Sequence, residues 1–202
     1  AASNRDGLVE VYIEAASWDG SSLGSVRRGE PISLVVNRLD ARGSVLYWAA
    51  DTAAIMRLPI GETEASFFWR NPPPGSTCVG CHSISEQMES LVVTHDGSSG
   101  RFSVVDISDP EDLSISVGTN DFNRLTFKTV SPDGQFIFGT NGPQASLFNI
   151  SNGVRIKNWQ FDNLVAHPDW SPDGTQIVMV HSTGDARSDL EFNGGEIVQY
   201  DF

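Results

Sequence analysis

Short apolar segments separated by Gly, Pro, Asn, Asp and Ser recur along most of the chain, and helical periodicity is nearly absent. Turn-rich sequence of this kind predicts an all-β sandwich, barrel or propeller. Residues 9–14 alternate between apolar and polar types, which predicts a half-buried strand, and residues 32–36 predict another. The other predicted strands are residues 45–50, 91–94, 102–107, 136–140, 146–150, 177–180 and 196–200.

An internal repeat favours the propeller over the sandwich and the barrel. The tetrapeptide Ser-Pro-Asp-Gly occurs at residues 131–134 and again at 171–174, forty residues later. Pro presets its own φ, Asp hydrogen-bonds the local backbone, and Gly takes a positive φ, so each copy predicts a tight turn. A period near forty residues with four short strands is the size of one propeller blade.

A decayed third copy of the repeat is present at residues 85–88, Ser-Glu-Gln-Met. The apolar residue Ile84 precedes it, as Val130 and Trp170 precede the other two copies. Met88 stands where the turn glycine belongs, so we expect this turn to be rebuilt. A fourth unit without the turn motif is predicted from strands at residues 45–48 and 54–58.

These repeats resemble the TolB-type β-propeller repeat over residues 85–202, and more weakly over residues 44–84. The resemblance implies an all-β propeller of four-stranded blades with Ser-Pro-Asp-Gly turns. We expect an N-terminal β segment at residues 1–41 and propeller blades at residues 42–202. Closed propellers typically have four to eight blades, so four or five units are few for a closed ring. We expect either an incomplete ring or one that is closed by residues 1–41 or by another chain. An open end favours self-association through its strand edge.

The two cysteines of the chain, Cys78 and Cys81, are followed directly by His82. The C-x-x-C-H pattern is typical of covalent attachment of one c-type heme. Two thiols at this spacing can add to the two vinyl groups of a porphyrin, and the adjacent imidazole then serves as the proximal iron ligand. A structural or redox-active thiol pair is the alternative.

Other uses of the motif have less support. A disulfide between Cys78 and Cys81 would close a very small loop and constrain the unfolded chain little. A zinc site would need a second ligand pair, and the remaining histidines are scattered. Residues 71–85, which begin with a proline-rich lead-in, are similar to bacterial envelope propellers that carry one c-type heme. That resemblance implies a periplasmic or extracellular location.

The repeat register also suggests a second axial ligand. Laying the three turns over one another places Cys81 at the position of Phe127 and His167, on the innermost strands of successive blades. His167 is therefore the candidate distal ligand of the heme iron, and Met88 is the fallback. The alternative is that His167 occupies an ordinary repeat position.

Charge narrows the set of partners. The chain has 13 Lys and Arg against 26 Asp and Glu, a formal net charge of -13. Such a surface repels nucleic acid and attracts a redox partner with a basic patch. No apolar run approaches the roughly 18 residues of a membrane-spanning helix, so no membrane span is expected.

The favoured function is electron transfer by a c-type cytochrome that is not an enzyme. The alternatives are a heme enzyme or gas sensor with an open distal site, and a scaffolding propeller. The chain begins with Ala1, so we expect a processed protein or part of a longer one.

Overall fold

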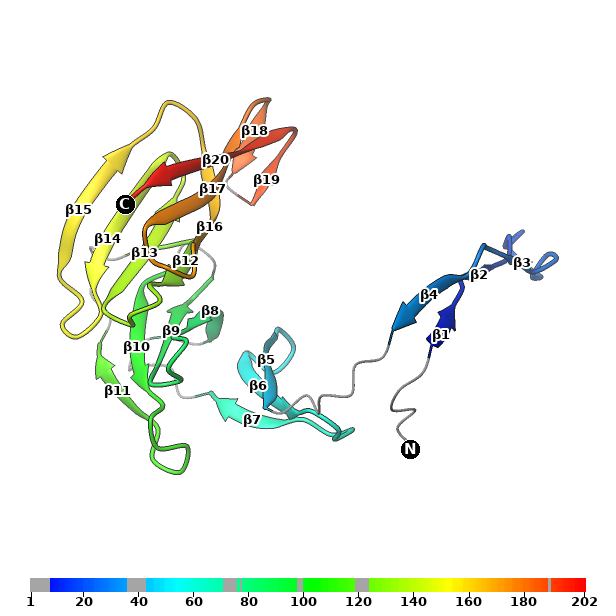
Figure 1. Cartoon of the computed structure of the whole chain (residues 1–202), viewed down its shortest axis with the longest axis horizontal. Coiled ribbons are helices and arrows are strands. Elements are labelled where there is room, and N and C mark those ends of the chain that lie inside the picture. Colours follow the sequence, from blue (N-terminus) through cyan, green and yellow to red (C-terminus); the bar gives the residue numbers. More distant parts are fainter. Residues whose placement is uncertain are drawn as a thin grey trace. The chain divides into compact units, whose positions relative to one another are not determined.

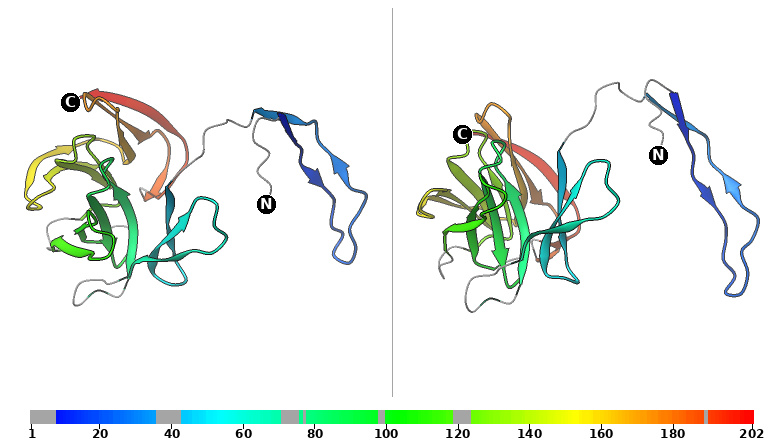
Figure 2. Two further views of the ribbon diagram at one scale, coloured as in Figure 1. Left: turned by 60° about the horizontal axis from the view of Figure 1, so that its bottom comes forward. Right: turned by 90° about the horizontal axis from the view of Figure 1, so that it is seen from below.

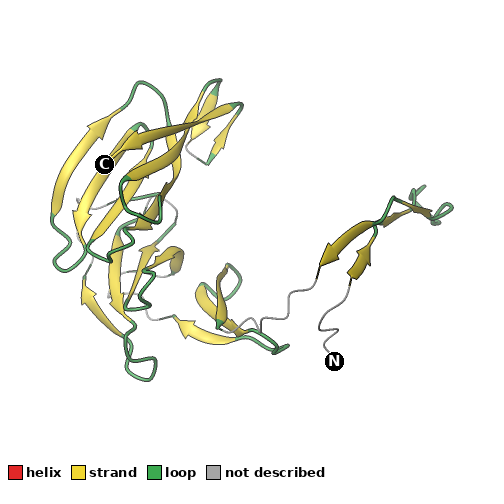
Figure 3. Cartoon of the chain, viewed as in Figure 1, coloured by secondary structure: helices red, strands yellow, loops and turns green. Residues whose placement is uncertain are grey.

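The computed structural model describes residues 8–35, 43–70, 76, 78–97, 100–118, 124–188 and 190–202. Regular structure in these ranges consists of strands without any helix (Figure 3), which confirms the predicted all-β class. None of the described residues belongs to a helix that could cross a membrane. The chain forms two compact units, Ala1–Gly43 and Ser44–Phe202. The predicted boundary between residues 41 and 42 lies outside the described residues.

The first unit is a long two-stranded hairpin. Its strands are β1 (Leu8–Val11), β2 (Glu14–Ala15), β3 (Arg27–Arg28) and β4 (Ile32–Val35), with β1 paired to β4 and β2 to β3. Arg28 donates two hydrogen bonds to Glu14 Oε1 and lies over the Tyr12 ring. Strands are present in both predicted ranges, 9–14 and 32–36. The half-burial expected of residues 9–14 is wrong, because Val11 is 44% and Ile13 76% exposed.

The second unit holds the repeats. Its strands are β5 (Ser44–Ala49), β6 (Ala54–Pro59), β7 (Ser66–Trp69), β8 (Val79–Ile84), β9 (Ser90–His95), β10 (Phe102–Asp106), β11 (Ser114–Val117), β12 (Phe127–Val130), β13 (Phe136–Asn141), β14 (Gln144–Asn149), β15 (Arg155–Gln160), β16 (Val165–Trp170), β17 (Gln176–Ser182), β18 (Ala186–Ser188), β19 (Glu191–Phe192) and β20 (Gly195–Asp201).

These strands form four successive antiparallel sheets, which are the blades of a propeller (Figures 1 and 2). The two middle blades, β8 to β11 and β12 to β15, have the predicted four strands in chain order. The first blade (β5, β6, β7) and the last (β16, β17, β20) have three each among the described residues, and β18 and β19 form a hairpin inserted between β17 and β20. The first strands contact one another in the order β5, β8, β12, β16. They therefore line the inner side of the blade array, and the described sheets do not close into a ring.

Apolar clusters fill the space between successive blades. Neighbouring residues of one strand serve different clusters: Leu91 and Val93 face the first blade, whereas Val92 faces the third. The third cluster includes Phe138, Trp170 and Met179 and lies between the last two blades. Because successive side chains of a strand point to opposite faces, each middle blade is buried on both sides. Each fully buried Leu, Val or Phe contributes about 1.5–3 kcal/mol.

The three repeat turns, 85–88, 131–134 and 171–174, share one set of hydrogen bonds. In each turn the amide of the fourth residue donates to the carbonyl of the serine, over 2.8–2.9 Å. The serine Oγ accepts the amide five residues later, from Ser90, Phe136 and Gln176 respectively, over 2.9–3.0 Å. The Ser-Pro-Asp-Gly copies therefore lie on equivalent turns, as predicted.

The expectation that the Met88 turn is rebuilt is wrong. Met88 has φ 58°, close to the φ of 71° at both Gly134 and Gly174. It adopts the left-handed conformation of the glycine it replaces, and its side chain is 54% exposed. The hydrogen bonds of the turn and the packing of β8 against β9 hold a non-glycine residue in a conformation that ordinarily costs about 1–2 kcal/mol.

We predict that Met88→Gly stabilises the protein by up to about 1 kcal/mol, because glycine adopts a positive φ without strain. Gly174→Ala should destabilise it by a similar amount, since a Cβ at Gly174 meets no atom closer than 3.7 Å and the cost is conformational. Urea unfolding of both variants measures the two effects. A loss of stability in Met88→Gly would contradict the strain argument.

Candidate functional site

The C-x-x-C-H motif lies at the start of the second blade's inner strand. Cys78 directly precedes β8, and Cys81 and His82 belong to it. Both thiols are free and partly exposed, and His82 is also partly exposed. The proline-rich lead-in at residues 71–75 lies outside the described residues.

A β-bulge interrupts β8 within the motif. Val79 pairs with His95 and His82 with Val93, so three steps along β8 oppose two along β9. The extra residue leaves Gly80 and Cys81 without partners in the ladder. Bulges of this kind re-aim side chains and are common next to functional sites.

The register places His82 on the face of β8 that lies toward the first blade. His82 pairs with Val93, and Val93 faces the first blade. In agreement, the His82 imidazole is hydrogen-bonded to the backbone of Leu46 in β5. The Cys81 thiol interacts electrostatically with the ammonium of Lys128 in β12, as the His82 imidazole also does.

Burial lowers the pKa of His82, and the positive charge of Lys128 lowers it further; the hydrogen bond to Leu46 opposes both. His82 is therefore a neutral imidazole at neutral pH. A neutral imidazole with one nitrogen hydrogen-bonded to a backbone carbonyl is the form that binds a metal through its other nitrogen.

Lys128 is the site residue that the sequence did not predict. It is 9% exposed, and its Nζ donates a hydrogen bond of 2.8 Å to the Cys81 carbonyl. That carbonyl also accepts from Thr94 Oγ1 over 3.2 Å. Burial lowers the pKa of Lys128 to about 8. The repeat alignment could have pointed to Lys128 as a site residue, because Lys128 occupies the position that His82 holds one blade earlier.

The donor set of the motif fits a c-type heme, since it combines two free thiols with a neutral, oriented imidazole. The bulge leaves Gly80 and Cys81 without partners in the ladder, directly before His82.

His167 lies in β16, two inner strands away from β8. Its ring centre is 4.0 Å from that of Phe127 in β12, the strand between them, and its φ is 51°. A bulge between Ala166 and Asp169 places His167 at the point where Cys81 stands in β8. The register underlying the distal-ligand prediction is therefore present, while the ligation itself stays a prediction.

The remaining histidines have other partners. His95 is fully buried, with Nε2 2.7 Å from Ser103 Oγ and Nδ1 3.4 Å from the Cys78 carbonyl. His181 lies 3.1 Å from the Tyr200 hydroxyl. Within the part of the chain that the structure describes, no three His, Cys, Asp or Glu side chains gather to hold a metal ion.

Comparisons with known proteins bear on the fold. No protein-family profile matches the sequence, and neither does any curated protein. Among solved structures, TolB from Acinetobacter baumannii is 19% identical with a TM-score of 0.53, and the match covers 94% of this chain and 46% of TolB. This likeness shows the β-propeller fold alone, because propellers host many unrelated functions.

Two further solved structures are similar over smaller fractions. A gluconolactonase from Xanthomonas campestris is 12% identical with a TM-score of 0.49, covering 63% of this chain and 41% of that one. Hydrazine synthase from Kuenenia stuttgartiensis is 15% identical with a TM-score of 0.43, covering 84% and 42%. The chain spans less than half the length of each of these three proteins.

The buried Lys128 predicts a rise of stability with pH. Its pKa is about 8 when folded against 10.5 for the free side chain, so the unfolded state binds more protons between these values and unfolding becomes less favourable as pH rises. At 1.36 kcal/mol per pKa unit the gain is at most about 3 kcal/mol. Urea unfolding at several pH values between 7 and 10 measures it.

Lys128→Met should remove this gain, whereas Lys157→Met, which replaces an exposed lysine of β15, should keep it. Parallel pH profiles for the wild type and Lys128→Met would show that the Lys128 ammonium is solvated.

Proposed function

We propose that this chain is an electron-transfer domain of the c-type cytochrome class, with one heme attached covalently to Cys78 and Cys81 on a β-propeller scaffold. His82 is the proximal iron ligand in this proposal, and the chain is an electron carrier rather than an enzyme. The observation that carries it is a pair of free, partly exposed thiols three positions apart, followed directly by a neutral imidazole, in a chain with no other cysteine.

The heme would supply the one-electron couple of its iron, and the residues around the motif would set its environment. The backbone of Leu46 orients His82 and selects the nitrogen that stays free for a metal. The Lys128 ammonium holds the Cys81 carbonyl at 2.8 Å. A positive charge at this position favours the reduced state, which carries one positive charge less.

The same proposal implies a compartment and a partner. Thioether attachment takes place outside the cytoplasm, so we place the protein in the periplasm or on the outside of a bacterial envelope. A formal charge of -13 steers it toward a redox protein with a basic patch, in a manner that weakens with added salt.

Heme attachment is tested by mass spectrometry of the full chain, exported together with a cytochrome c maturation system. We expect a mass increase of one heme, no free thiols, and a heme stain that survives denaturing electrophoresis. Cys78→Ala with Cys81→Ala should lose the stain, because thioether bonds are the only covalent link. Two free thiols, or a disulfide between them, in the wild type would overturn the proposal.

Distal ligation by His167 is tested by absorption spectroscopy. The wild type should be six-coordinate, low-spin and unreactive to carbon monoxide. His167→Ala should keep the heme but become high-spin and respond to added imidazole, because the variant lacks the second nitrogen ligand. Met88→Leu is the control and should leave the spectrum unchanged. An unchanged spectrum in His167→Ala, with a change in Met88→Leu, would reassign the sixth ligand to Met88.

A high-spin wild type that binds carbon monoxide would instead indicate a heme enzyme or gas sensor with an open distal site.

A further inference from the structure

A hollow lies beside the C-x-x-C-H motif, at the end of the second blade where β9 ends and β10 begins. Its volume is about 290 Å³, and it is lined by His95, Asp96, Gly100, Arg101 and Arg124. The hollow adjoins the motif, because His95 Nδ1 lies 3.4 Å from the Cys78 carbonyl oxygen. A Cβ at Gly100 would collide with the His95 carbonyl, so the backbone at Gly100 lies directly against the buried histidine.

Two of the lining residues, Arg101 and Arg124, are directly opposite each other. They form an isolated antiparallel bridge, and the Cβ atoms of such a pair are about 5 Å apart on the same face. Like charges in this arrangement repel each other, and an anion between them removes the repulsion. Asp96 supplies one carboxylate, with Oδ2 3.8 Å from a guanidinium nitrogen of Arg101. It is the one acidic side chain among the described residues that line the hollow, so positive charge is in excess there.

The two arginines lie on the same face of the second blade as His82. His82 pairs with Val93 and Val93 with Ser103, so these three residues form one row across the sheet. Arg101 is two positions before Ser103, and side chains two positions apart point to the same face. Two strand spacings and two residue steps place the Cα atoms of Arg101 and His82 about 12 Å apart.

Positive charge extends from the hollow to the motif. Burial lowers the pKa of His95, and the hydrogen bond of its ring to the Cys78 carbonyl opposes this effect. Among the charged groups, Asp96 raises the pKa of His95, whereas Arg101 and Lys128 lower it. His95 is therefore neutral at neutral pH, and the cations of this region are the two arginines and Lys128.

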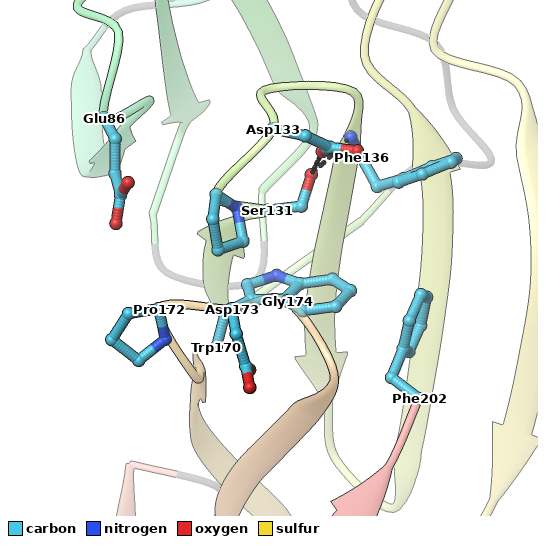
Figure 4. Close-up of a pocket in the computed structure, with 10 residues that line it drawn as sticks. Glu86, Ser131, Asp133, Phe136, Trp170, Pro172, Asp173, Gly174 and Phe202 are labelled. Carbon is cyan, nitrogen blue, oxygen red and sulfur yellow. Dashed lines mark hydrogen bonds between the residues drawn. The ribbon is translucent and has the colours of Figure 1, made fainter.

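Another hollow of the second unit has the opposite charge. It is bordered by the repeat turns and lined by Glu86, Asp133 and Asp173, among other residues (Figure 4). None of the described residues that line it is Lys or Arg. A carboxylate ligand is repelled from this hollow and attracted to the one beside the motif.

A c-type heme brings two carboxylates to the motif. Its vinyl groups react with the thiols, and its two propionates extend from another edge of the porphyrin. The planar guanidinium of arginine binds a carboxylate through two parallel N–H bonds, so two arginines match two propionates. Arg101 is far enough from His82 for a porphyrin to lie between them, and its long side chain can reach the propionates.

We propose that Arg101 and Arg124 bind the two propionates of the heme. The inference rests on the electron-transfer function and adds the orientation of the cofactor, with its vinyl groups at the motif and its carboxylates at the junction of β9 and β10. The guanidiniums keep the propionates ionised. They also offset two negative charges in a chain whose formal net charge is already -13.

Occupation of the hollow is tested on the full chain, with and without heme, by arginine modification with phenylglyoxal and peptide mass spectrometry. Arg155, an exposed residue of β15, is the internal control. We expect the heme to slow the modification of Arg101 and Arg124 at least about fivefold and to leave Arg155 unchanged. Equal rates at Arg101 and Arg124 in the two forms would overturn the proposal.

The same assay distinguishes the heme from a free oxyanion, which has the same binding chemistry. Inorganic phosphate is the probe. In the heme-loaded chain it should give the two arginines no further protection, because the propionates already occupy the hollow. Equal protection by phosphate in the heme-free and heme-loaded chains would assign the hollow to a free anion and overturn the proposal.

The charge contact is tested with Arg124→Gln, which replaces an exposed side chain. Loss of a cation beside a carboxyl group raises its pKa by about 1 unit or more, so the propionate-linked step in the pH dependence of the reduction potential should move to higher pH by that amount. Arg124→Lys should restore most of the shift, and Arg155→Gln should leave the profile unchanged. His95, Asp96 and Lys128 are present in every variant and do not account for a difference. An unaltered profile in Arg124→Gln would overturn the proposal.

The heme content of the mature chain separates this inference from the proposed function. A chain without heme would refute both. A heme-loaded chain in which Arg101 and Arg124 are not protected would refute propionate binding alone and leave the electron-transfer function intact.

Discussion

The hydrogen bond from a main-chain amide to the serine hydroxyl in each repeat turn fixes the register on which the second unit depends. It closes the turns at Ser85, Ser131 and Ser171 over 2.9–3.0 Å. Because side chains alternate between faces, a slip of one residue would exchange the two faces of a strand. The apolar clusters between blades would then lose their members, and Lys128 would lose the Cys81 carbonyl. The packing between blades and the contact of Lys128 with the candidate site therefore depend on one local constraint.

Much of this arrangement was predictable from the sequence because the turn has a strong local signature. Two intact copies gave the period, and the serine with its preceding apolar residue was enough to locate the third copy. The correspondence of Cys81, Phe127 and His167 on β8, β12 and β16 follows from the same spacing. The conformation of Met88 was not predictable, because glycine at this position lowers the cost of a positive φ but is not needed when the flanking strands hold the turn.

The burial of particular residues was not predictable, because it depends on which other strands pack against them and the local sequence pattern does not show this. Residues 9–14 alternate between apolar and polar types. This pattern shows only that the two faces of the strand differ in polarity, and not that another part of the chain covers one of them. A lone lysine in a strand ordinarily keeps its ammonium in water, so the burial of Lys128 arises from the position of β8 beside β12. The bulge at Gly80 and Cys81 likewise comes from pairing with a strand that follows later in the chain.

His82 and Lys128 occupy one repeat position, and each forms a hydrogen bond to the backbone of the preceding inner strand, at Leu46 and Cys81 respectively. This position therefore links neighbouring blades. An imidazole that donates from one nitrogen keeps the other free, so His82 can retain its link while it binds a metal.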